Sequence, residues 1–531
     1  MNPHVLLSIG LTALSLAAPA GAAFAQNAVI PPPAVAFRRA TGTEVGARID
    51  RALAVPALKN AVVGILVRSL IDGRTLYERN PDLALVPASN MKLLTATAAL
   101  VKLGTDFRYK TTLLHTGSID RNGTLNGDLY LRGSGDPSLD SKRLLEMAQK
   151  LRAAGVQKIN GRILADATAF DDQRIGDGWQ WDDEAYYYSA QVAGLNCDEN
   201  VIALEVRPAD RIGAPAQVVV GGADSRLLAF EQTRYVQVTN RAVTTPGATT
   251  GAAGLSTGIK PEAKLRFSRA RATNELIVGG VIPLGSAPVS EALTIEDPAL
   301  FTATRFGELC PVGGVNLPSV KDRRIEKGKT PPTATLLVET ESTPLGDLVK
   351  QFLKRSDNLF GEALLKTVGG GTTGAGVQAV VDVLKDGGVD SSGLTMADGS
   401  GLSRTDTVTP RLLTSLLIFA DRKLDTDRRG ALINGLPEAG IDGTLRNRMK
   451  GTAAEAHVRA KTGSLSNVSS LSGYLQTKRG ERLVFSILMN NFALGNARAA
   501  RAAQDAIAVA LTDAPQDMGR GKTARPRGAK E

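Results

Sequence analysis

The chain has 531 residues, of which 43% are hydrophobic and 22% are charged, and its formal net charge is +10. This composition is typical of a folded protein, and the length corresponds to three or four domains of about 150 residues each. Its three His and two Cys are too few for a zinc finger, a His-rich metal centre or a disulfide scaffold. The sequence has no basic stripe interleaved with aromatic residues, so we expect no nucleic-acid partner.

The N-terminus is predicted to be an export signal. An apolar run over 5–18 is too short to span a membrane as a mature helix, and the small-x-small sequence Ala23-Phe24-Ala25 follows it. We therefore expect residues 1–25 to be a signal peptide cleaved near Ala25, and the mature protein to be periplasmic without a transmembrane anchor. Residues 1–4 carry no Lys or Arg, so an N-terminal membrane anchor remains the alternative. In an exported protein Cys197 and Cys310 could pair, or could remain two separate buried thiols.

Hydrophobic periodicity and turn residues divide the rest of the chain into three parts. The first part is predicted to contain a linker at 26–42, strands at 61–70 and 75–77, and a helix at 87–102. The second, from about 112 to 335, alternates short β-rich runs with glycine turns, and its stretch Ala242–Gly258, which lacks core-forming residues, is predicted to be a loop. The third is predicted to contain helices at 344–366, 375–387 and 410–420, strands at 470–478 and 482–490, and a helix at 497–511.

The first candidate motif is Ser89-Asn90-Met91-Lys92. On a helix, positions i and i+3 share one face, so the Lys92 amine is held beside the Ser89 hydroxyl. Free N–H groups at a helix start favour negative charge, which suits a serine nucleophile whose base is a lysine of lowered pKa. Taken alone, the motif is better explained by a capped helix with a surface lysine.

Two tripeptides carry matching chemistry. Ser356-Asp357-Asn358 follows a helical run and provides a hydroxyl that can carry a proton and a carboxamide that donates and accepts. By itself this sequence is more typical of a turn or a helix cap. Lys461-Thr462-Gly463 lies where a strand could begin and provides an ammonium group, a hydroxyl and a glycine that allows close approach to a ligand.

The three motifs are specific in combination. Ser356 follows Ser89 by 267 residues, and Lys461 follows Ser356 by 105 residues. A set of Ser-x-x-Lys, Ser-Asp-Asn and Lys-Thr-Gly marks penicillin-binding proteins and class A β-lactamases. His115 and His457 lie in no recognisable triad context, so a lysine is the available base. The chain therefore resembles the penicillin-recognising serine acyltransferases.

The long interval after the first motif distinguishes the branches of that group. A large insertion directly after the nucleophile helix resembles the D-Ala-D-Ala carboxypeptidase/endopeptidase family, the low-molecular-mass class C penicillin-binding proteins. The resemblance covers about 43–512. Three further stretches agree with it: 178–183 with 188–190, 398–404, and 461–465.

The resemblance implies an α/β fold, in which a penicillin-binding-protein/β-lactamase-like serine acyltransferase domain has an antiparallel sheet flanked by helices and a large β-rich insertion. We expect the catalytic domain to comprise 26–111 and 336–513, and the insertion to comprise 112–335 as one or two subdomains. Residues 514–531 are expected to be a disordered basic tail.

The resemblance also implies roles for the residues of the three motifs. Ser89 is the acylated nucleophile and Lys92 its general base. Ser356 relays a proton to the departing D-Ala amine, and Asn358 binds the peptide's amide. Lys461 contributes positive potential.

The remainder of the third motif is expected to bind substrate. Thr462 holds the substrate carboxylate, Gly463 allows the ligand to approach the backbone, and the N–H groups of Ser89 and Ser464 form the oxyanion hole. No metal or other cofactor is expected, because the protein supplies the charges that the chemistry needs.

A side-chain pocket is implied by the insertion. Asp183 matches an acidic residue that meets the free amino end of a diaminopimelate side chain. Tyr188 lines that pocket, and Arg404 and Ser466 lie near it.

Each of these assignments has a structural alternative. Asp183 could belong to a solvated acidic loop, because two other acids flank it. Arg404 could instead brace the Asp398 loop through a salt bridge. Trp179 and Trp181 are interpreted as packing anchors rather than substrate platforms.

The function implied is cleavage of D-Ala from peptidoglycan stem peptides, or of D-Ala–diaminopimelate cross-links, through an acyl-Ser89 intermediate. The expected partners are peptidoglycan peptides and β-lactam antibiotics, which acylate Ser89. A β-lactamase and an inactive cell-wall-binding scaffold are the alternatives.

Overall fold

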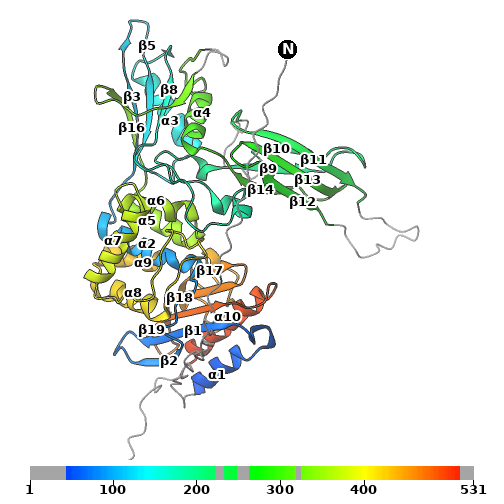
Figure 1. The fold of residues 1–531 in the computed structure, drawn as a ribbon, viewed down its shortest axis with the longest axis vertical. Helices are drawn as coiled ribbons and strands as arrows, with labels where there is room; N and C mark the ends of the chain where they lie inside the picture. Colours follow the sequence, from blue (N-terminus) through cyan, green and yellow to red (C-terminus); the bar gives the residue numbers. More distant parts are fainter. Residues whose placement is uncertain (1–43, 222–232, 248–261, 319–323, 515–531) are drawn as a thin grey trace, which may run out of the picture. The chain divides into compact units, whose positions relative to one another are not determined.

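The structure is a computed structural model that describes residues 44–221, 233–247, 262–318 and 324–514 (Figure 1). The predicted signal peptide, the linker at 26–42, and the basic tail from 515 onward lie outside the described residues, as does most of the predicted loop at 242–258.

A five-stranded antiparallel sheet joins the two ends of the described chain. Its order is β17-β18-β19-β1-β2, with the bounds Val458–Leu465, Val468–Gln476, Arg482–Asn490, Val62–Ser69 and Thr75–Arg79. The register that pairs Val62 with Asn490 places the first long strand against the last one. As a result, the sheet exists only when segments about 400 residues apart meet.

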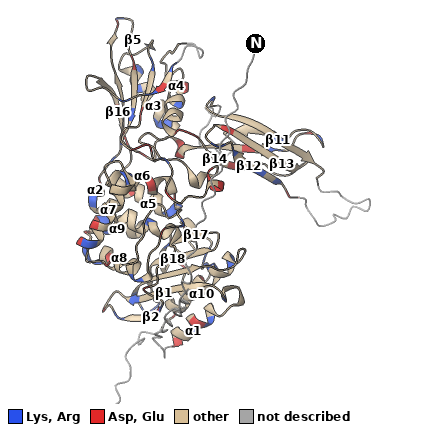
Figure 2. Cartoon of the chain, viewed as in Figure 1, with Lys and Arg blue, Asp and Glu red and all other residues tan. Residues whose placement is uncertain are grey.

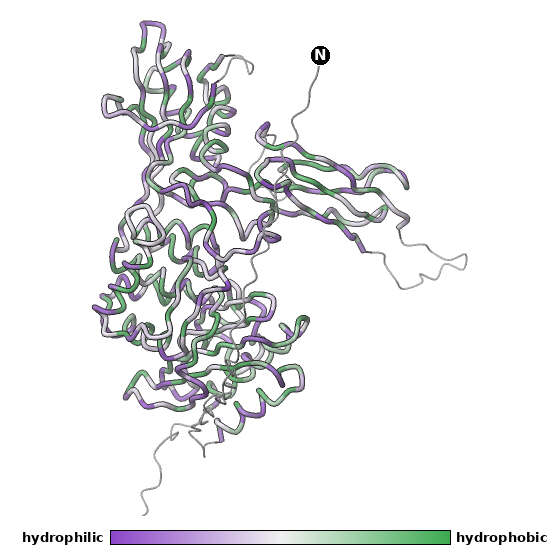
Figure 3. The backbone as a smooth tube through the Cα atoms, in the orientation of Figure 1, coloured by the Kyte–Doolittle hydropathy of each residue, from purple (hydrophilic) through white to green (hydrophobic). Residues whose placement is uncertain are grey.

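Each face of this sheet packs on its own hydrophobic core because side chains alternate along a strand. In β19, Phe485 and Ile487 pack with α1 (Glu44–Leu53) and α10 (Ala497–Thr512). Val484 and Leu488 of the same strand pack with α8 (Pro410–Lys423). Figure 1 shows the two helix layers on either side of the sheet, and Figure 3 shows hydrophobic residues along its strands.

Helix α2 (Lys92–Leu103) lies within the helical layer. Nine of its twelve residues are buried, from Lys92 to Leu100. A helix that is apolar on all sides must be surrounded, and the surrounding helices are α5 (Leu345–Arg355), α6 (Asn358–Val368), α7 (Thr373–Asp386), α8 and α9 (Thr426–Gly435). The start of α2 is therefore held rigidly.

The inserted region contains a second five-stranded sheet, of order β15-β8-β6-β3-β16. Its strands span Ile325–Lys327, Ile163–Asp166, Leu129–Gly133, Lys110–His115 and Thr335–Glu341. Helices α3 (Ser141–Ala153) and α4 (Pro298–Leu309) share a core with it. The predicted junctions at 111/112 and 335/336 fall within strands β3 and β16, which pair with each other.

Three smaller sheets complete the insertion. The first pairs β4 (Ser118–Ile119), β5 (Thr124–Asn126) and β7 (Lys158–Ile159). The other two follow the orders β10-β9-β14 and β11-β13-β12, with the bounds Gln217–Val220, Val201–Arg207, Val289–Thr294, Gln237–Thr245, Glu275–Pro283 and Lys264–Arg269. The short helices η3 (Trp181–Asp183), η4 (Tyr187–Ser189) and η5 (Asp198–Asn200) precede β9.

The predicted fold class and most of the predicted elements are confirmed, with differences at their ends. The helix predicted over 344–366 is two helices, α5 and α6, that meet at Ser356. The predicted loop begins too early, because β11 continues to Thr245. Lys461 lies within β17 rather than at its start. Helix α9 was missed because only Leu432 and Gly435 of its ten residues are buried, which leaves no amphipathic pattern.

Cys197 and Cys310 are both buried thiols, and no disulfide joins them. No helix in the described ranges has the length and apolarity needed to cross a bilayer. Acidic and basic residues are interspersed along the elements in Figure 2.

Candidate active site

Ser89 and Lys92 lie where the short helix η2 (Ala88–Met91) passes into α2. Their spacing puts both side chains on one face, with Lys92 Nζ 3.1 Å from Ser89 Oγ. Lys92 is fully buried, whereas Ser89 lines an open cavity. The pair therefore joins a desolvated amine to a hydroxyl that a ligand can reach.

The Lys92 amine also has two acceptors. Its Nζ lies 2.6 Å from Asn358 Oδ1 and 2.6 Å from the Ser400 carbonyl oxygen. Neither oxygen carries a hydrogen, so a neutral amine donates both of its hydrogens to them and directs its lone pair at Ser89. Burial lowers the pKa of Lys92 from 10.5 to about 8, and nearby carboxyl groups, led by Asp398, oppose that shift only in part. The geometry suits removal of the Ser89 proton.

Ser356 ends helix α5 in the left-handed conformation, at φ 61°. This backbone turn separates α5 from α6 and directs the hydroxyl into the cavity, where Lys461 Nζ donates to Ser356 Oγ at 2.7 Å. Lys461 Nζ also donates to the Thr462 carbonyl at 2.8 Å. Burial and the charge of Lys92 lower the pKa of Lys461 well below its usual range. Ser356 is therefore placed to pass on its own proton while it accepts one from Lys461.

Asp357 and Asn358 begin helix α6. The Asp357 carboxylate accepts from the Phe360 N–H at 3.2 Å and so caps the helix. Asn358 donates from Nδ2 to the Tyr188 carbonyl at 2.7 Å, and its Oδ1 accepts from Lys92. The amide is thus oriented by the insertion on one side and by the base on the other.

Strand β17 approaches Ser89 at Gly463. A Cβ added there would lie 2.9 Å from Ser89 N, 2.7 Å from the Pro87 carbonyl and 2.1 Å from Ser470 Oγ, so only glycine fits. Asn90 Nδ2 donates to the Lys461 carbonyl at 3.0 Å and ties the helix to the strand. Strand β17, which carries the third motif, is consequently held beside the first motif.

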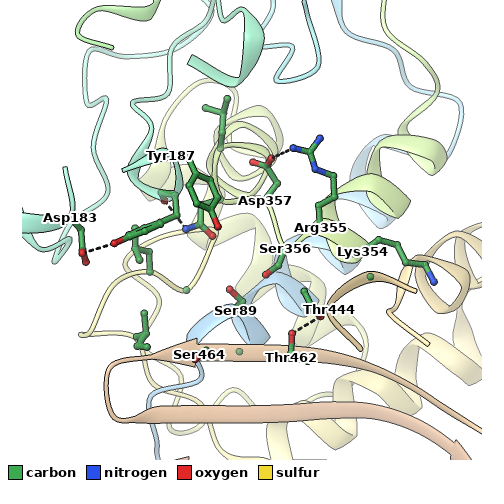
Figure 4. A pocket seen from close by; sticks show the side chains of 18 of the residues that line it. Ser89, Asp183, Tyr187, Lys354, Arg355, Ser356, Asp357, Thr444, Thr462 and Ser464 are labelled. Carbon is green, nitrogen blue, oxygen red and sulfur yellow. Dashed lines mark hydrogen bonds and ion pairs between the residues drawn. The ribbon is translucent and has the colours of Figure 1, made fainter. Parts of the chain in front are cut away.

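The cavity at this junction has a volume of about 930 Å³. Figure 4 shows Ser89, Ser356 and Thr462 around it, with Thr462 Oγ1 2.7 Å from Thr444 Oγ1. Ser464 and Ser466 line it as exposed side chains.

The insertion contributes an acidic end to the same cavity. Asp183 and Tyr188 line it, and the Tyr188 hydroxyl donates to Asp183 Oδ1 at 2.8 Å. Burial and Asp183 raise the pKa of Tyr188, so the phenol keeps its proton. Arg404, also at the wall, donates to Gln180 Oε1 at 2.8 Å and to Asn467 Oδ1 at 3.2 Å.

Comparison with known proteins identifies the family. The sequence profile described as the D-Ala-D-Ala carboxypeptidase 3 (S13) family matches residues 45–514. The chain belongs to this family. The predicted class of enzyme, a D-Ala-D-Ala carboxypeptidase with a penicillin-binding-protein fold, is thereby confirmed.

Two relatives and one solved structure show how far the similarity extends. The D-alanyl-D-alanine carboxypeptidase of Actinomadura sp. (strain R39) is 38% identical over 490 residues, which cover 89% of this chain and 85% of the relative. The D-alanyl-D-alanine carboxypeptidase DacB of Haemophilus influenzae is 27% identical over 442 residues, covering 82% and 86%. The crystal structure of penicillin binding protein 4 (dacB) from Haemophilus influenzae has a TM-score of 0.73 at 24% identity, covering 87% of this chain and 98% of that one.

The structure brings every predicted site residue of this S13 chain to one cavity or directly beneath it. Lining residues are Ser89, Asp183, Tyr188, Ser356, Asn358, Arg404, Thr462, Gly463, Ser464 and Ser466. The buried amines of Lys92 and Lys461 reach the hydroxyls of Ser89 and Ser356 from below. The motifs predicted that these residues would converge. They did not predict the hydrogen-bond partners that hold the residues in place.

The structure bears on two of the structural alternatives. Trp179 Nε1 donates to Asp398 Oδ2 at 2.8 Å, which agrees with a packing anchor. Trp181 is 71% exposed, so its interpretation as a packing anchor is wrong; the ring instead has the Arg271 guanidinium 5.8 Å from its centre. In the described structure Arg404 bonds to two amide side chains rather than to Asp398.

Buried acids lie near Lys92, and none of them was singled out from the sequence as a site residue, although the Asp398 loop was named. Glu362, Asp398 and Asp406 are each 2% exposed or less. Both Glu362 oxygens accept from Gly399 N–H at 3.1 Å, which supports the loop whose Ser400 carbonyl contacts Lys92. Glu362 lies four residues after Asn358 on the same helix face, and that spacing was the available signal.

We expect Gly463→Ala to push β17 away from Ser89, since the contacts to backbone atoms cannot yield as a flexible side chain would. Loss of stability by about 1–3 kcal/mol is expected from overpacking, together with slower reaction at Ser89. Denaturant unfolding and acylation by labelled penicillin measure the two effects. Gly279→Ala is the matched control, because Gly279 lies in strand β13 with open space around its Cβ position. Equal behaviour of the two variants would contradict the close-approach argument.

Proposed function

We propose that this S13 protein hydrolyses the terminal D-Ala-D-Ala bond of peptidoglycan stem peptides, and D-Ala–diaminopimelate cross-links, through an acyl-Ser89 intermediate. The observation that carries the proposal is the buried Lys92 amine, which is 3.1 Å from Ser89 Oγ and has two other oxygens to accept its hydrogens. The names of its relatives supply the substrate class. We further propose that the chain is exported to the periplasm, where such peptides occur.

Acylation begins when Lys92 takes the Ser89 proton and Ser89 Oγ attacks the carbonyl between the two D-Ala residues. Negative charge then develops on the former carbonyl oxygen. The N–H groups of Ser89 and Ser464 stabilise it, at about 3–4 kcal/mol for each donor. The tight contact at Gly463 fixes the distance between these two donors.

Collapse of the tetrahedral intermediate breaks the amide bond. Ser356 donates its proton to the departing amine and is reprotonated from the lysines, so the proton removed from Ser89 leaves with D-Ala. Water then attacks the ester, returns a proton to Ser89 and releases the shortened peptide. All of these steps use groups of the protein, and the described ranges hold no group of three His, Cys, Asp or Glu side chains arranged for a metal ion.

Substrate orientation follows from the charge at the two ends of the cavity. Thr462 binds the substrate carboxylate, whose charge favours the protonated form of Lys461, and Asn358 binds the peptide amide. At the other end Asp183 accepts the free ammonium of a diaminopimelate side chain, with Tyr188 beside it and Arg404 and Ser466 on the wall. A β-lactam presents a strained amide to the same groups and acylates Ser89.

Labelled penicillin tests the proposal. Wild type is expected to carry stable label, and Ser89→Ala none, because the ester forms on that oxygen. Muropeptide digestion followed by mass spectrometry should show loss of D-Ala or opening of cross-links by wild type only. Rapid release of label from wild type would instead indicate a β-lactamase, and absence of label would indicate a wall-binding scaffold; either overturns the proposal.

The acylation rate is expected to rise with pH through the pKa of Lys92, about 8. Below that pH the amine is protonated and has no lone pair, so the rate should fall about tenfold per pH unit.

Lys92→Ala should lower the acylation rate by about 10²- to 10⁴-fold near neutral pH without unfolding the protein. Stopped-flow acylation from pH 6 to 9 measures both, with circular dichroism as the folding control. Normal acylation by Lys92→Ala would refute the base assignment.

Asp183→Ala is expected to reduce cleavage of diaminopimelate peptides by about tenfold or more while sparing acylation by penicillin, because only the peptide carries the ammonium group. The rates of peptide cleavage and of acylation by penicillin, measured on the same preparation, distinguish a binding role from a structural one. Asp182→Ala, a change at an exposed neighbour that does not line the cavity, is the control. Equal losses on both substrates would assign Asp183 a structural role.

A further inference from the structure

The inserted region holds the Ser356–Asn358 turn at two points. The Tyr188 carbonyl accepts from Asn358 Nδ2 at 2.7 Å. Glu199 lies 2.7 Å from the guanidinium of Arg355, the residue directly before the turn. Both contacts come from the segment that precedes β9, and Glu199 and Arg355 line the cavity.

The backbone at Glu199 is unusual. Asp198, Glu199 and Asn200 have φ angles of 49°, 54° and 56°, which gives three successive non-glycine residues in the left-handed region. Each such residue costs conformational free energy, and such stretches persist where the surroundings determine the backbone. Left-handed residues of this kind also concentrate at functional sites.

Side chains behind the turn at 198–200 hold this backbone conformation in place. Asn200 is fully buried; its Nδ2 donates to the Gln191 carbonyl and to Asn196 Oδ1, each at 2.8 Å. Its Oδ1 accepts from the Cys197 N–H at 3.1 Å. None of these bonds involves Arg355, so the insertion presents Glu199 to the catalytic domain in a fixed position.

The other side of the contact is constrained as well. Arg355 is the last residue of α5, and Ser356 follows in the left-handed conformation. Figure 4 shows Arg355 and Asp357 directed toward each other, with 3.8 Å between the charged atoms. Burial and Glu199 raise the pKa of Asp357 to about 6, and Arg355 opposes this. The Glu199–Arg355 ion pair therefore connects two left-handed segments: residues 198–200 of the inserted region and Ser356 at the end of α5.

We propose that Glu199 is a positioning residue: through Arg355 it holds the Ser356–Asn358 turn in the geometry that serves Ser89 and Lys92. Glu199 does not touch the reacting atoms. The inserted region, which interrupts the catalytic domain, is on this basis a required part of the active site. The inference rests on the proposed acylation of Ser89.

The effect is expected in a rate constant rather than in stability. The Arg355 and Glu199 side chains are 46% and 33% exposed, and such ion pairs contribute little to the free energy of unfolding. A small displacement of catalytic groups, in contrast, is costly in rate. Glu199→Gln keeps the shape of the side chain and removes its charge.

The experiment is stopped-flow acylation of the full chain by penicillin, with the first-order acylation constant separated from the dissociation constant of the preceding complex. For Glu199→Gln we expect the first-order constant to fall by about tenfold with the dissociation constant and melting temperature nearly unchanged. Titration with labelled penicillin gives the active fraction, so a partly misfolded preparation is not mistaken for a slow one.

Glu339→Gln is the matched control. Glu339 lies in the insertion's sheet, is 36% exposed and pairs with Lys110 at 2.8 Å, away from the cavity. It should acylate like wild type. Arg355→Met should be at least as slow as Glu199→Gln, because it also removes the contact with Asp357. The double variant should be no slower than Arg355→Met, because the Glu199–Arg355 contact is already lost in that variant.

Two results would overturn the proposal: a first-order constant for Glu199→Gln within twofold of wild type, or fully additive losses in the double variant. Failure of wild type to acylate at Ser89 would instead refute the proposed function itself.

Discussion

The site depends on one buried amine. Lys92 is surrounded by protein, and the energy of placing a cation there is what brings its pKa to about 8. Its two fixed acceptors, Asn358 Oδ1 and the Ser400 carbonyl, then leave one direction for the lone pair, toward Ser89. Burial sets the basicity and hydrogen bonding sets the direction.

The groups around Lys92 have to keep that environment compatible with a neutral amine. Three carboxyl groups lie buried behind it, and ionisation of all three would favour the protonated lysine. Burial and Asp398 raise the pKa of Glu362 to about 8 and that of Asp406 to about 10. These shifts favour the protonated forms of Glu362 and Asp406. The Asp398 carboxyl oxygens accept the N–H groups of Ser400, Gly401 and Ser403 at 2.6–3.1 Å. The acids support the loop, and they offset only part of the lowering of the Lys92 pKa by burial.

The insertion orients the second motif, as the buried acids support the loop beside Lys92. A loop of a separate sheet region contributes Asp183 and Tyr188 to the cavity, and the Tyr188 carbonyl orients Asn358, which in turn contacts Lys92. Tyr188 thus connects the two parts of the site, because its hydroxyl bonds Asp183 and its backbone carbonyl bonds the amide that contacts Lys92. The side chains proposed to recognise substrate are therefore connected to the amine proposed to move the proton.

Much of this protein was predictable from local patterns. The Ser89–Lys92 pair follows from helix geometry alone, because residues three apart share a face whatever surrounds them. The strands predicted at 61–70 and 482–490 follow from short apolar runs next to turn residues, and these runs are buried almost throughout. The three motifs together were sufficient to predict the family and its chemistry. Gly463 could be singled out because its motif required close approach, although what it approaches could not.

Other features came only from tertiary structure. Contacts such as Glu199–Arg355, Asn358–Tyr188 and Lys92–Ser400 join residues 156 to 308 positions apart and leave no periodic trace in the sequence. The left-handed turn at 198–200 contains no glycine to mark it. Trp181 was misassigned because an aromatic residue reads the same in sequence whether it is buried or exposed. Local sequence thus determined which groups carry the chemistry, since helix and strand geometry act over a few residues; their burial, partners and orientation were decided by the tertiary fold, since these depend on which distant segments pack together.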